Sequence, residues 1–213
     1  MTQARVAIVI INWKLKDETL RCLESLQALE PPSGFLPRVV VVDNGSGDGS
    51  AQCIASAHPE SELISLSTNI GFGAACNVAI RQIMRNGNED YVFLLNNDAS
   101  VHPKVLSKLI QVAEVHPEAG IFGPKIYCQD ESHTIWYAGA RKRWGVLAAA
   151  DTGRGKVDQG QFDVLREVDY VFGAAMLIRR NVFERIGLFD ERFFLYLEDM
   201  DFCLRAQKAG FSL

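Results

Sequence analysis

Residues 6–11 read Val-Ala-Ile-Val-Ile-Ile, an apolar and mostly β-branched run with no polar interruption. A strand that is buried on both faces of a sheet has this composition. Residues 16–29 follow, and their leucines recur every three positions, as in the buried stripe of an amphipathic helix. The two patterns together predict a strand followed by a helix.

The same alternation continues through the first half of the chain. We expect further strands at 38–42, 62–66 and 91–95, and further helices that end near Ala57 or span 74–85 and 103–115. Four such units in sequence predict an α/β protein with a doubly wound, mostly parallel sheet. Ligands bind beyond the carboxyl ends of the strands in such sheets, so the residues after each strand are candidates for a site.

The second half of the chain has shorter apolar runs and predicts a mixed part of the fold. The expected strands are 120–127, 134–138, 167–171 and 174–178, the expected loop is 151–161, and the expected helices are 181–186, capped by Asn181, and 199–209. No internal repeat or low-complexity tract divides the chain, so we predict one domain of residues 1–213.

Composition excludes several classes of protein. The formal net charge of -4 argues against a large nucleic-acid-binding surface, and we expect the basic run at 141–143 to be a solvated loop. The five cysteines have no Cys-x-x-Cys spacing, which predicts buried free thiols. No apolar run approaches the roughly 20 residues that cross a bilayer. We therefore expect a cytoplasmic protein, and peripheral attachment to the inner face of a membrane stays open.

Asp43 ends the second expected strand and is followed by Asn44, Gly45 and Ser46. A carboxylate at this position can accept hydrogen bonds from a nucleotide base or ribose, or it can simply start a turn. Enzymes that bind dinucleotides also carry an acid here, but they need a glycine-rich turn after the first strand. Residues 12–15 read Asn-Trp-Lys-Leu, so a dinucleotide is disfavoured.

Residues 69–77 read Asn-Ile-Gly-Phe-Gly-Ala-Ala-Cys-Asn, at the junction of the third strand and the helix that follows. Small residues at this position let a ligand approach the backbone, and free N–H groups at a helix start suit a phosphate. A tight turn with close helix packing explains the same residues, and both interpretations are open.

Residues 96–98 read Asn-Asn-Asp at the end of the fourth strand. These side chains offer the oxygen ligands that Mg²⁺ or Mn²⁺ prefers when the ion bridges a diphosphate. The alternative is a polar turn before the next helix.

Residues 189–201 carry five acids among aromatic residues. Glu198, Asp199 and Asp201 lie at the start of the last expected helix, where the helix dipole favours anions and where Asp201 can act as a cap. Neighbouring carboxylates raise one another's pKa, which makes a better base, whereas the dipole lowers it. The sequence does not decide between these two effects.

Six blocks, in order, resemble the inverting glycosyltransferases of family 2, which have the fold called GT-A. The blocks are 9–12, 41–46, 69–73, 95–98, 168–176 and 187–201, and within the family they are most similar to bacterial rhamnosyltransferases. The resemblance covers nearly the whole chain. It implies a nucleotide-binding half at 1–118 and an acceptor-binding and catalytic half at 119–213.

The resemblance also implies roles for single residues. Asp43, with Asn12 nearby, would contact the nucleotide base, and Gly71 with its neighbours would approach the ribose-diphosphate. Asp98 would hold Mg²⁺ or Mn²⁺, Asp199 of the Glu198–Asp199 pair would be the general base, and Gly173 and Ala174 would line the junction of donor and acceptor. The residues expected at the donor site are therefore Asn12, Asp43, Asn69, Gly71, Phe72, Asn97, Gly173 and Ala174.

Two features depart from the family pattern. Asn96 stands where the family has the first acid of its metal-binding motif, so the metal would have fewer charged ligands. The chain ends at Leu213, before the further strand and the histidine that family members carry, and we expect a C-terminally truncated domain.

The expected reaction is inverting transfer of a sugar from a nucleoside diphosphate to a hydroxyl of a saccharide or lipid-linked acceptor, in polysaccharide or glycolipid synthesis. Two alternatives are a module that binds nucleotide sugars or polysaccharide without turnover, and a nucleotidyltransferase. The second needs a glycine-rich basic loop for a triphosphate after the first strand, and residues 12–16 do not provide one.

Overall fold

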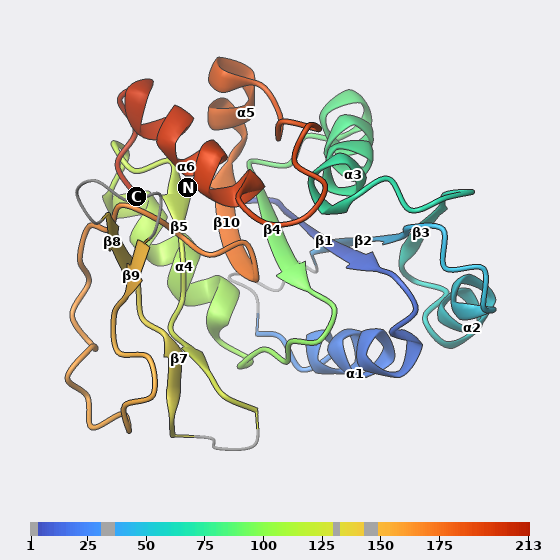
Figure 1. The fold of residues 1–213 in the computed structure, drawn as a ribbon, viewed down its shortest axis with the longest axis horizontal. Coiled ribbons are helices and arrows are strands. Elements are labelled where there is room, and N and C mark those ends of the chain that lie inside the picture. Colours follow the sequence, from blue (N-terminus) through green and yellow to red (C-terminus); the bar gives the residue numbers. More distant parts are fainter. Residues whose placement is uncertain (1–3, 31–36, 130–132, 143–148) are drawn as a thin grey trace.

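A computed structural model describes residues 4–30, 37–129, 133–142 and 149–213 (Figure 1). Its elements, in chain order, are β1 (Val6–Asn12), α1 (Lys16–Leu26), β2 (Arg38–Asp43), α2 (Ser50–Ala57), β3 (Glu62–Ser65), α3 (Phe72–Asn86), β4 (Tyr91–Asn96), α4 (Val105–Val115), β5 (Ile121–Phe122), β6 (Ile126–Tyr127), β7 (Ile135–Tyr137), β8 (Ala140–Lys142), β9 (Ala149–Asp151), β10 (Ala175–Arg179), α5 (Arg180–Ile186) and α6 (Glu198–Lys208). The expected α/β architecture is confirmed.

The central sheet is mostly parallel, with strand order β3-β2-β1-β4-β10-β5. The first four strands in this order run parallel, as the repeated strand–helix pattern predicts. β10 is antiparallel to β4 and to β5. Two small two-stranded sheets, β6-β7 and β8-β9, complete the mixed second half.

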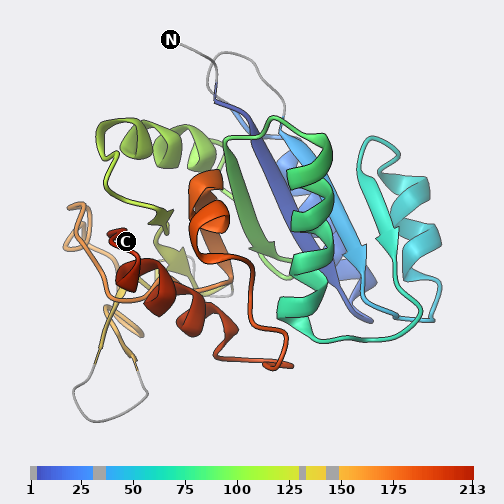
Figure 2. The same cartoon turned by 90° about the horizontal axis from the view of Figure 1, so that it is seen from above.

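Helices cover both faces of the sheet (Figures 1 and 2). Successive side chains of a strand point to opposite faces, so β1 sends Val9 into one buried cluster and Ile8 and Ile10 into the other. α3, α5 and α6 pack with the first cluster, and α1, α2 and α4 pack with the second. This two-sided burial explains why the strands read as continuous apolar runs.

The antiparallel strand β10 has a consequence for the site. Parallel strands bring their carboxyl ends to one edge of the sheet, whereas an antiparallel neighbour brings its first residues there. Ala175 is therefore opposite Leu95, and the N–H of Asn96 donates to the carbonyl of Ala174 at 2.9 Å. The residues that precede β10 lie at the same edge as the ends of β1, β2 and β4.

Several expected boundaries are wrong. The strand expected at 120–127 splits into β5 and β6 around Pro124, which has no N–H to donate to a ladder. Residues 167–171 form no strand, and only Tyr170 makes an isolated bridge, to Ala140. The first helix ends at Leu26 instead of Leu29.

Three helix starts also differ from expectation. α4 begins at Val105, after Lys104, and not at Pro103. Asn181 lies inside α5, whose cap residue is Arg179 in an extended conformation. Asp201 does not cap α6, because the cap residue is Leu197 and Asp201 lies inside the helix, where its carboxylate accepts a hydrogen bond from Arg205 Nε at 2.7 Å.

Two surface predictions need correction. Cys22, Cys76 and Cys203 are buried free thiols as expected, but Cys53 is exposed and Cys128 is half-buried. Arg141 and Lys142 belong to β8 and not to a loop, while position 143 lies outside the described residues. Among the described residues, no helix combines the length and the apolar character needed to cross a bilayer.

Candidate functional site

The ends of β1 and β2 form a buried polar cluster around Asp43. The register of the two strands sets Asn12 opposite Asp43, and Asn12 Nδ2 donates to Asp43 Oδ1 at 2.7 Å. Ser46 Oγ donates to the same oxygen at 2.6 Å, and its N–H reaches Oδ2 at 3.3 Å. All three side chains are at least nine-tenths buried. The carboxylate is therefore held rigidly at the strand end, and its Oδ2 has the weaker of these bonds.

Thr19 extends this cluster toward β4. Its hydroxyl donates to Asn12 Oδ1 at 2.8 Å and accepts a hydrogen bond from Asn97 Nδ2 at 2.9 Å. The chain from Asp43 through Asn12 and Thr19 to Asn97 joins the ends of three strands. Thr19 is not among the residues predicted from the sequence. It is fully buried, and a buried polar side chain of this kind needs a hydrogen-bond partner.

The loops after β2 and β3 are tied together by two amide side chains. Asn44 Nδ2 donates to Asn69 Oδ1 at 3.0 Å, and the N–H of Ile70 donates to Asn44 Oδ1 at 3.0 Å. Asn69 Oδ1 also accepts the N–H of Gly71 at 2.9 Å. Asn69 and Asn44 therefore shape the turn that leads into α3.

Gly71 has a conformation that other residues rarely adopt, with φ 90° and ψ 164°. A Cβ atom at this position would lie 2.6 Å from the carbonyl oxygen of Phe194, and that oxygen accepts the N–H of Phe72 at 2.9 Å. The sequence left open whether this glycine admits a ligand or permits tight packing. In the fold, the main chain of Phe194 makes the close approach.

Asn96, Asn97 and Asp98 lie where the sequence predicts, at the end of β4. Asp98 is exposed, and its charge adds to burial in raising the pKa of the Cys22 thiol to about 12. Among the described residues, no group of three or more acids, histidines and cysteines is placed to hold a metal ion. One exposed carboxylate beside amide oxygens suits an ion that is mainly bound by a diphosphate, and not a protein cage.

Asp199 lies in the first turn of α6 and is 8% exposed. Its Oδ2 accepts the hydroxyl of Tyr170 at 2.6 Å and the N–H of Gly173 at 2.9 Å, and its Oδ1 accepts the N–H of Met200 at 2.8 Å. A Cβ atom at position 173 would lie 3.0 Å from Oδ2, a tight contact that a glycine avoids. The contact brings the carboxylate to the residues that precede β10.

Tyr170 is a functional candidate that the sequence did not single out. Burial and the charge of Asp199 raise the pKa of its hydroxyl well above the usual value. The hydroxyl therefore stays protonated and donates to Asp199 at every physiological pH. The residue belongs to the block 168–176, but no local pattern connects it to an acid 29 positions away.

Glu198 is only 5% exposed, and its Oε2 has no hydrogen-bond partner among the described residues. Burial raises the pKa of Glu198 to about 7, and the charge of Asp199 acts in the same direction. Its side chain lies against Gly73 of α3, where a Cβ atom would be 3.4 Å from its Cβ and Cγ atoms. The two neighbouring acids thus differ: Asp199 accepts three hydrogen bonds, whereas Oε2 of Glu198 accepts none from the described residues.

The segment that precedes these acids is strained and exposed. Tyr196 and Leu197 have φ values of 69° and 73°, which cost roughly 1–2 kcal/mol for each residue with a Cβ atom. The side chains of Phe194, Leu195, Tyr196 and Leu197 are 46–73% exposed. Strain of this kind persists only where the surrounding structure imposes it, and it is concentrated at functional sites.

Residues 6–187 match the family described as Glycosyl transferase family 2. The N-acetylglucosaminyl-diphospho-decaprenol L-rhamnosyltransferase of Mycobacterium tuberculosis is 30% identical over an alignment that covers 95% of this chain and 70% of that protein. The rhamnosyltransferase WbbL of Escherichia coli is 27% identical, covering 98% of this chain and 79% of that protein.

A solved structure shares the fold. The mannosyltransferase PcManGT from Pyrobaculum calidifontis, in complex with GDP-Man and Mn²⁺, superposes with a TM-score of 0.68 at 16% identity. The match covers 99% of this chain and 54% of that protein, so the chain spans about half of its length.

Proposed function

This chain belongs to glycosyl transferase family 2 and has the GT-A fold, and from that premise we propose a specific reaction. The enzyme transfers a hexose from a nucleoside diphosphate to a hydroxyl of a lipid-linked saccharide, with inversion at the anomeric carbon. We propose rhamnose as the sugar, because both relatives are named as rhamnosyltransferases. Because the family consists of glycosyltransferases, its match supports neither a module that only binds sugars nor a nucleotidyltransferase.

One observation carries the proposed mechanism. Asp199 is the buried acid whose carboxylate is fixed by Tyr170, Gly173 and Met200 at the sheet edge where β4 ends. An inverting transfer needs one base and no protein nucleophile. The acceptor oxygen attacks the anomeric carbon, its proton passes to the Asp199 carboxylate, and the bond from the anomeric carbon to the diphosphate oxygen breaks. The fixed position of the carboxylate orients it toward the acceptor hydroxyl.

The donor lies across the strand ends in this proposal. Asp43 accepts a hydrogen bond from the nucleotide base through Oδ2, because Oδ1 already accepts from Asn12 and Ser46. The ribose-diphosphate passes the turn of Asn69, Gly71 and Phe72 and then Asn97. Gly173 and Ala174 line the place where donor and acceptor meet, since the N–H of Gly173 donates to Asp199 and the carbonyl of Ala174 accepts the N–H of Asn96.

Asp98, with the amide oxygen of Asn96, would hold Mg²⁺ or Mn²⁺ together with the donor diphosphate. When bound, the ion neutralises the charge that develops on the leaving diphosphate. A single exposed carboxylate fits an ion that arrives with its nucleotide, and Mg²⁺ in particular is commonly bound through one or two carboxylates and substrate phosphates.

The acceptor is lipid-linked in the mycobacterial relative, as its name states. We propose the same class of acceptor here and a place of action at the cytoplasmic face of a membrane. The exposed apolar side chains of residues 194–197 directly precede the acid pair and would face that surface. Apolar side chains of this kind favour the interface between water and lipid.

A donor panel tests the proposal. The full chain is heated with dTDP-rhamnose, UDP-N-acetylglucosamine and GDP-mannose, each with and without Mn²⁺, and the melting temperature is measured. We expect the dTDP sugar with Mn²⁺ to give the largest increase, because a ligand that binds only the folded state stabilises it. Stabilisation by none of the three sugars would contradict the proposed donor class, and a larger effect of another nucleotide would reassign the donor.

A further inference from the structure

Helix α3 contacts the residues that lead into α6, the helix that carries Asp199. We call residues 189–197 the anchored segment. The carboxamide of Asn77 forms a pair of hydrogen bonds with the main chain of Phe189: Nδ2 donates to its carbonyl at 2.9 Å, and Oδ1 accepts its N–H at 3.0 Å. Asn77 is 1% exposed and Phe189 is 4% exposed, so water does not compete with this pair.

Further contacts with α3 follow along the segment. Asn77 Nδ2 also donates to Glu191 Oε1 at 3.0 Å, and Arg81, one turn later on α3, pairs with the same oxygen at the surface. The N–H of Phe72 donates to the carbonyl of Phe194. Figure 2 shows the segment running beside the start of α3 before it enters α6. Tyr196 and Leu197, which have left-handed conformations, come next along the chain. The contacts of the anchored segment with α3 can impose this strain.

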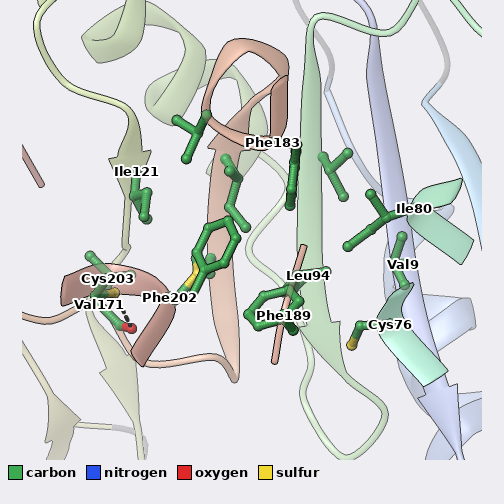
Figure 3. Close-up of a cluster of buried hydrophobic side chains, with 14 of the residues drawn as sticks. Val9, Cys76, Ile80, Leu94, Ile121, Val171, Phe183, Phe189, Phe202 and Cys203 are labelled. Carbon is green, nitrogen blue, oxygen red and sulfur yellow. Dashed lines mark hydrogen bonds between the residues drawn. The ribbon is translucent and has the colours of Figure 1, made fainter. Parts of the chain in front are cut away.

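Phe189 connects this anchor to the catalytic helix. Its ring stacks on the ring of Phe202, with centroids 4.5 Å apart and planes inclined by 28° (Figure 3). Phe202 is fully buried and lies three residues after Asp199, on the same side of α6. A Cβ atom at Gly73, one turn before Asn77, would lie 3.4 Å from side-chain atoms of both Phe189 and Glu198. Direct contacts therefore join Asn77 to Phe189 and Phe189 to Phe202, and α6 itself joins Phe202 to Asp199.

We propose that Asn77 is a positioning residue for the general base. Its carboxamide fixes Phe189, and Phe189 fixes the start of α6, so that Asp199 meets Tyr170 and Gly173 at hydrogen-bonding distance. The proposal rests on the proposed function, since it assigns Asn77 a part in the step that Asp199 performs. It adds that α3, whose first turn adjoins the donor diphosphate, also places the base.

The test compares Asn77→Ala with Arg81→Ala, which removes the surface ion pair to Glu191 and keeps the buried pair with Phe189. Release of dTDP from dTDP-rhamnose, with water as the acceptor of the sugar, is measured in the full chain, and donor Kd is measured by titration. We expect Asn77→Ala to lower kcat roughly tenfold or more, because small displacements of a catalytic group are costly. The donor Kd of Asn77→Ala should stay within about twofold of the wild-type value. In a plot of its kcat against pH, the limb on the acidic side should shift. Arg81→Ala should match the wild-type protein in all three.

A second variant covers the case in which Asn77→Ala does not fold. Phe189→Leu keeps both hydrogen bonds to Asn77 and loses the ring stacked on Phe202, and we expect the same fall in kcat at an unchanged donor Kd. Wild-type kcat in either folded variant, or a loss of donor affinity that accounts for the whole effect, would overturn the positioning role. A wild-type chain that turns over no nucleotide sugar would instead overturn the proposed function.

Discussion

Asp199 and Glu198 are adjacent in sequence but have opposite environments. Asp199 accepts three hydrogen bonds, two of them from the segment that precedes β10. Glu198 points to the start of α3, and its Oε2 has no partner among the described residues. Successive residues at a helix start point in different directions, so neighbours in the chain meet different parts of the fold.

The first prediction concerns the base. We expect Asp199→Asn to lower transfer by a factor of roughly 10²–10⁴, because the amide cannot accept the proton of the acceptor hydroxyl. Donor binding should persist, since Asn12 and Asp43, which are proposed to bind the nucleotide base, lie at the ends of β1 and β2 and not on α6. Nucleotide release and donor titration measure the two effects. Tyr170→Phe, which keeps the carboxylate, is the matched control and should retain measurable transfer. Full turnover by Asp199→Asn would refute the assignment.

The second prediction concerns the pH dependence of stability. The pKa of Glu198 is about 7 in the folded chain and 4.5 as a free side chain. The folded state therefore holds a proton more tightly than the unfolded state. The resulting stabilisation is complete below pH 4.5 and is lost as the pH rises through about 7. The loss amounts to about 3.5 kcal/mol at most, since one pKa unit corresponds to about 1.4 kcal/mol.

Glu198→Gln removes this proton equilibrium. We expect the variant to match the wild-type protein near pH 4.5 and to be more stable than it at pH 8. Urea denaturation at both pH values gives the free energies of unfolding, with the exposed Glu24→Gln as control. If the difference between Glu198→Gln and the wild-type protein is the same at both pH values, the raised pKa of Glu198 is refuted.

Helix α3 and strand β10 are the elements that assemble the site. β10 runs antiparallel to β4 and carries Gly173 and Ala174 to the edge where the parallel strands end. α3 packs on the same face of the sheet as α6 and holds the anchored segment against it. Neither element provides a predicted metal ligand or the predicted base. Each nevertheless fixes the position of residues that are predicted to take part in sugar transfer.

The third prediction belongs to the turn that starts α3. Gly71→Ala should destabilise the fold by about 3 kcal/mol, because the new Cβ atom meets the Phe194 carbonyl and the backbone conformation suits only glycine. Gly47→Ala is the matched control, since Gly47 also has a positive φ, of 65°, but has no atom within 4 Å of its Cβ position. Its cost should be about 1 kcal/mol, from backbone strain alone.

Urea denaturation of both variants measures these costs. Equal destabilisation by the two substitutions would show that the contact between Gly71 and Phe194 contributes nothing beyond backbone strain. A larger cost for Gly71→Ala would support the close packing of the turn against the anchored segment.

At the scale of the whole molecule, donor and metal should stabilise the fold together. The fourth prediction is that Mn²⁺ alone leaves the melting temperature nearly unchanged, because the described residues form no cluster of ligands for it. At a donor concentration of about 100 times Kd, donor with Mn²⁺ should add about 2.7 kcal/mol. For a chain of this size, that corresponds to an increase of roughly 5–10 °C.

EDTA should abolish most of this increase, and Asp98→Ala should have the same effect in the presence of Mn²⁺. The exposed Glu24→Gln again serves as a control that keeps the full increase. Donor stabilisation that persists in EDTA at the same size would count against Asp98 as a metal ligand.

The sequence predicted the first half of the molecule better than the second. Long strand–helix units carry their own periodicity, so β1 to α4 lie close to the predicted ranges. The short strands of the second half depend on partners far along the chain. Val168, Tyr170 and Val171 are residue types that favour a strand, but the N–H groups of this segment go to scattered partners: Val168 donates to Leu213 and Asp169 donates to Ala140.

The candidate site also contains residues that the sequence predicts and residues that it does not. Asn12 and Asp43 could be predicted as neighbours, because each ends a strand of a parallel sheet and the register places them opposite each other. The placement of Asp98 at the end of β4 follows from the same rule. Thr19, Asn77 and Tyr170 could not be found this way. Their roles depend on hydrogen bonds to residues 7, 112 and 29 positions away along the chain.

The sequence by itself determined the α/β class, the order of the first four strand–helix units, and the polar residues at the strand ends. These features follow from local periodicity and from the geometry of parallel sheets. Only the tertiary structure decided that Gly71 faces Phe194, that Asp199 is held by Tyr170 and Gly173, and that Oε2 of Glu198 has no partner among the residues that the structure describes. The reason is physical: a residue's neighbours in sequence set its backbone pattern, whereas its burial and its partners are set by packing between distant elements.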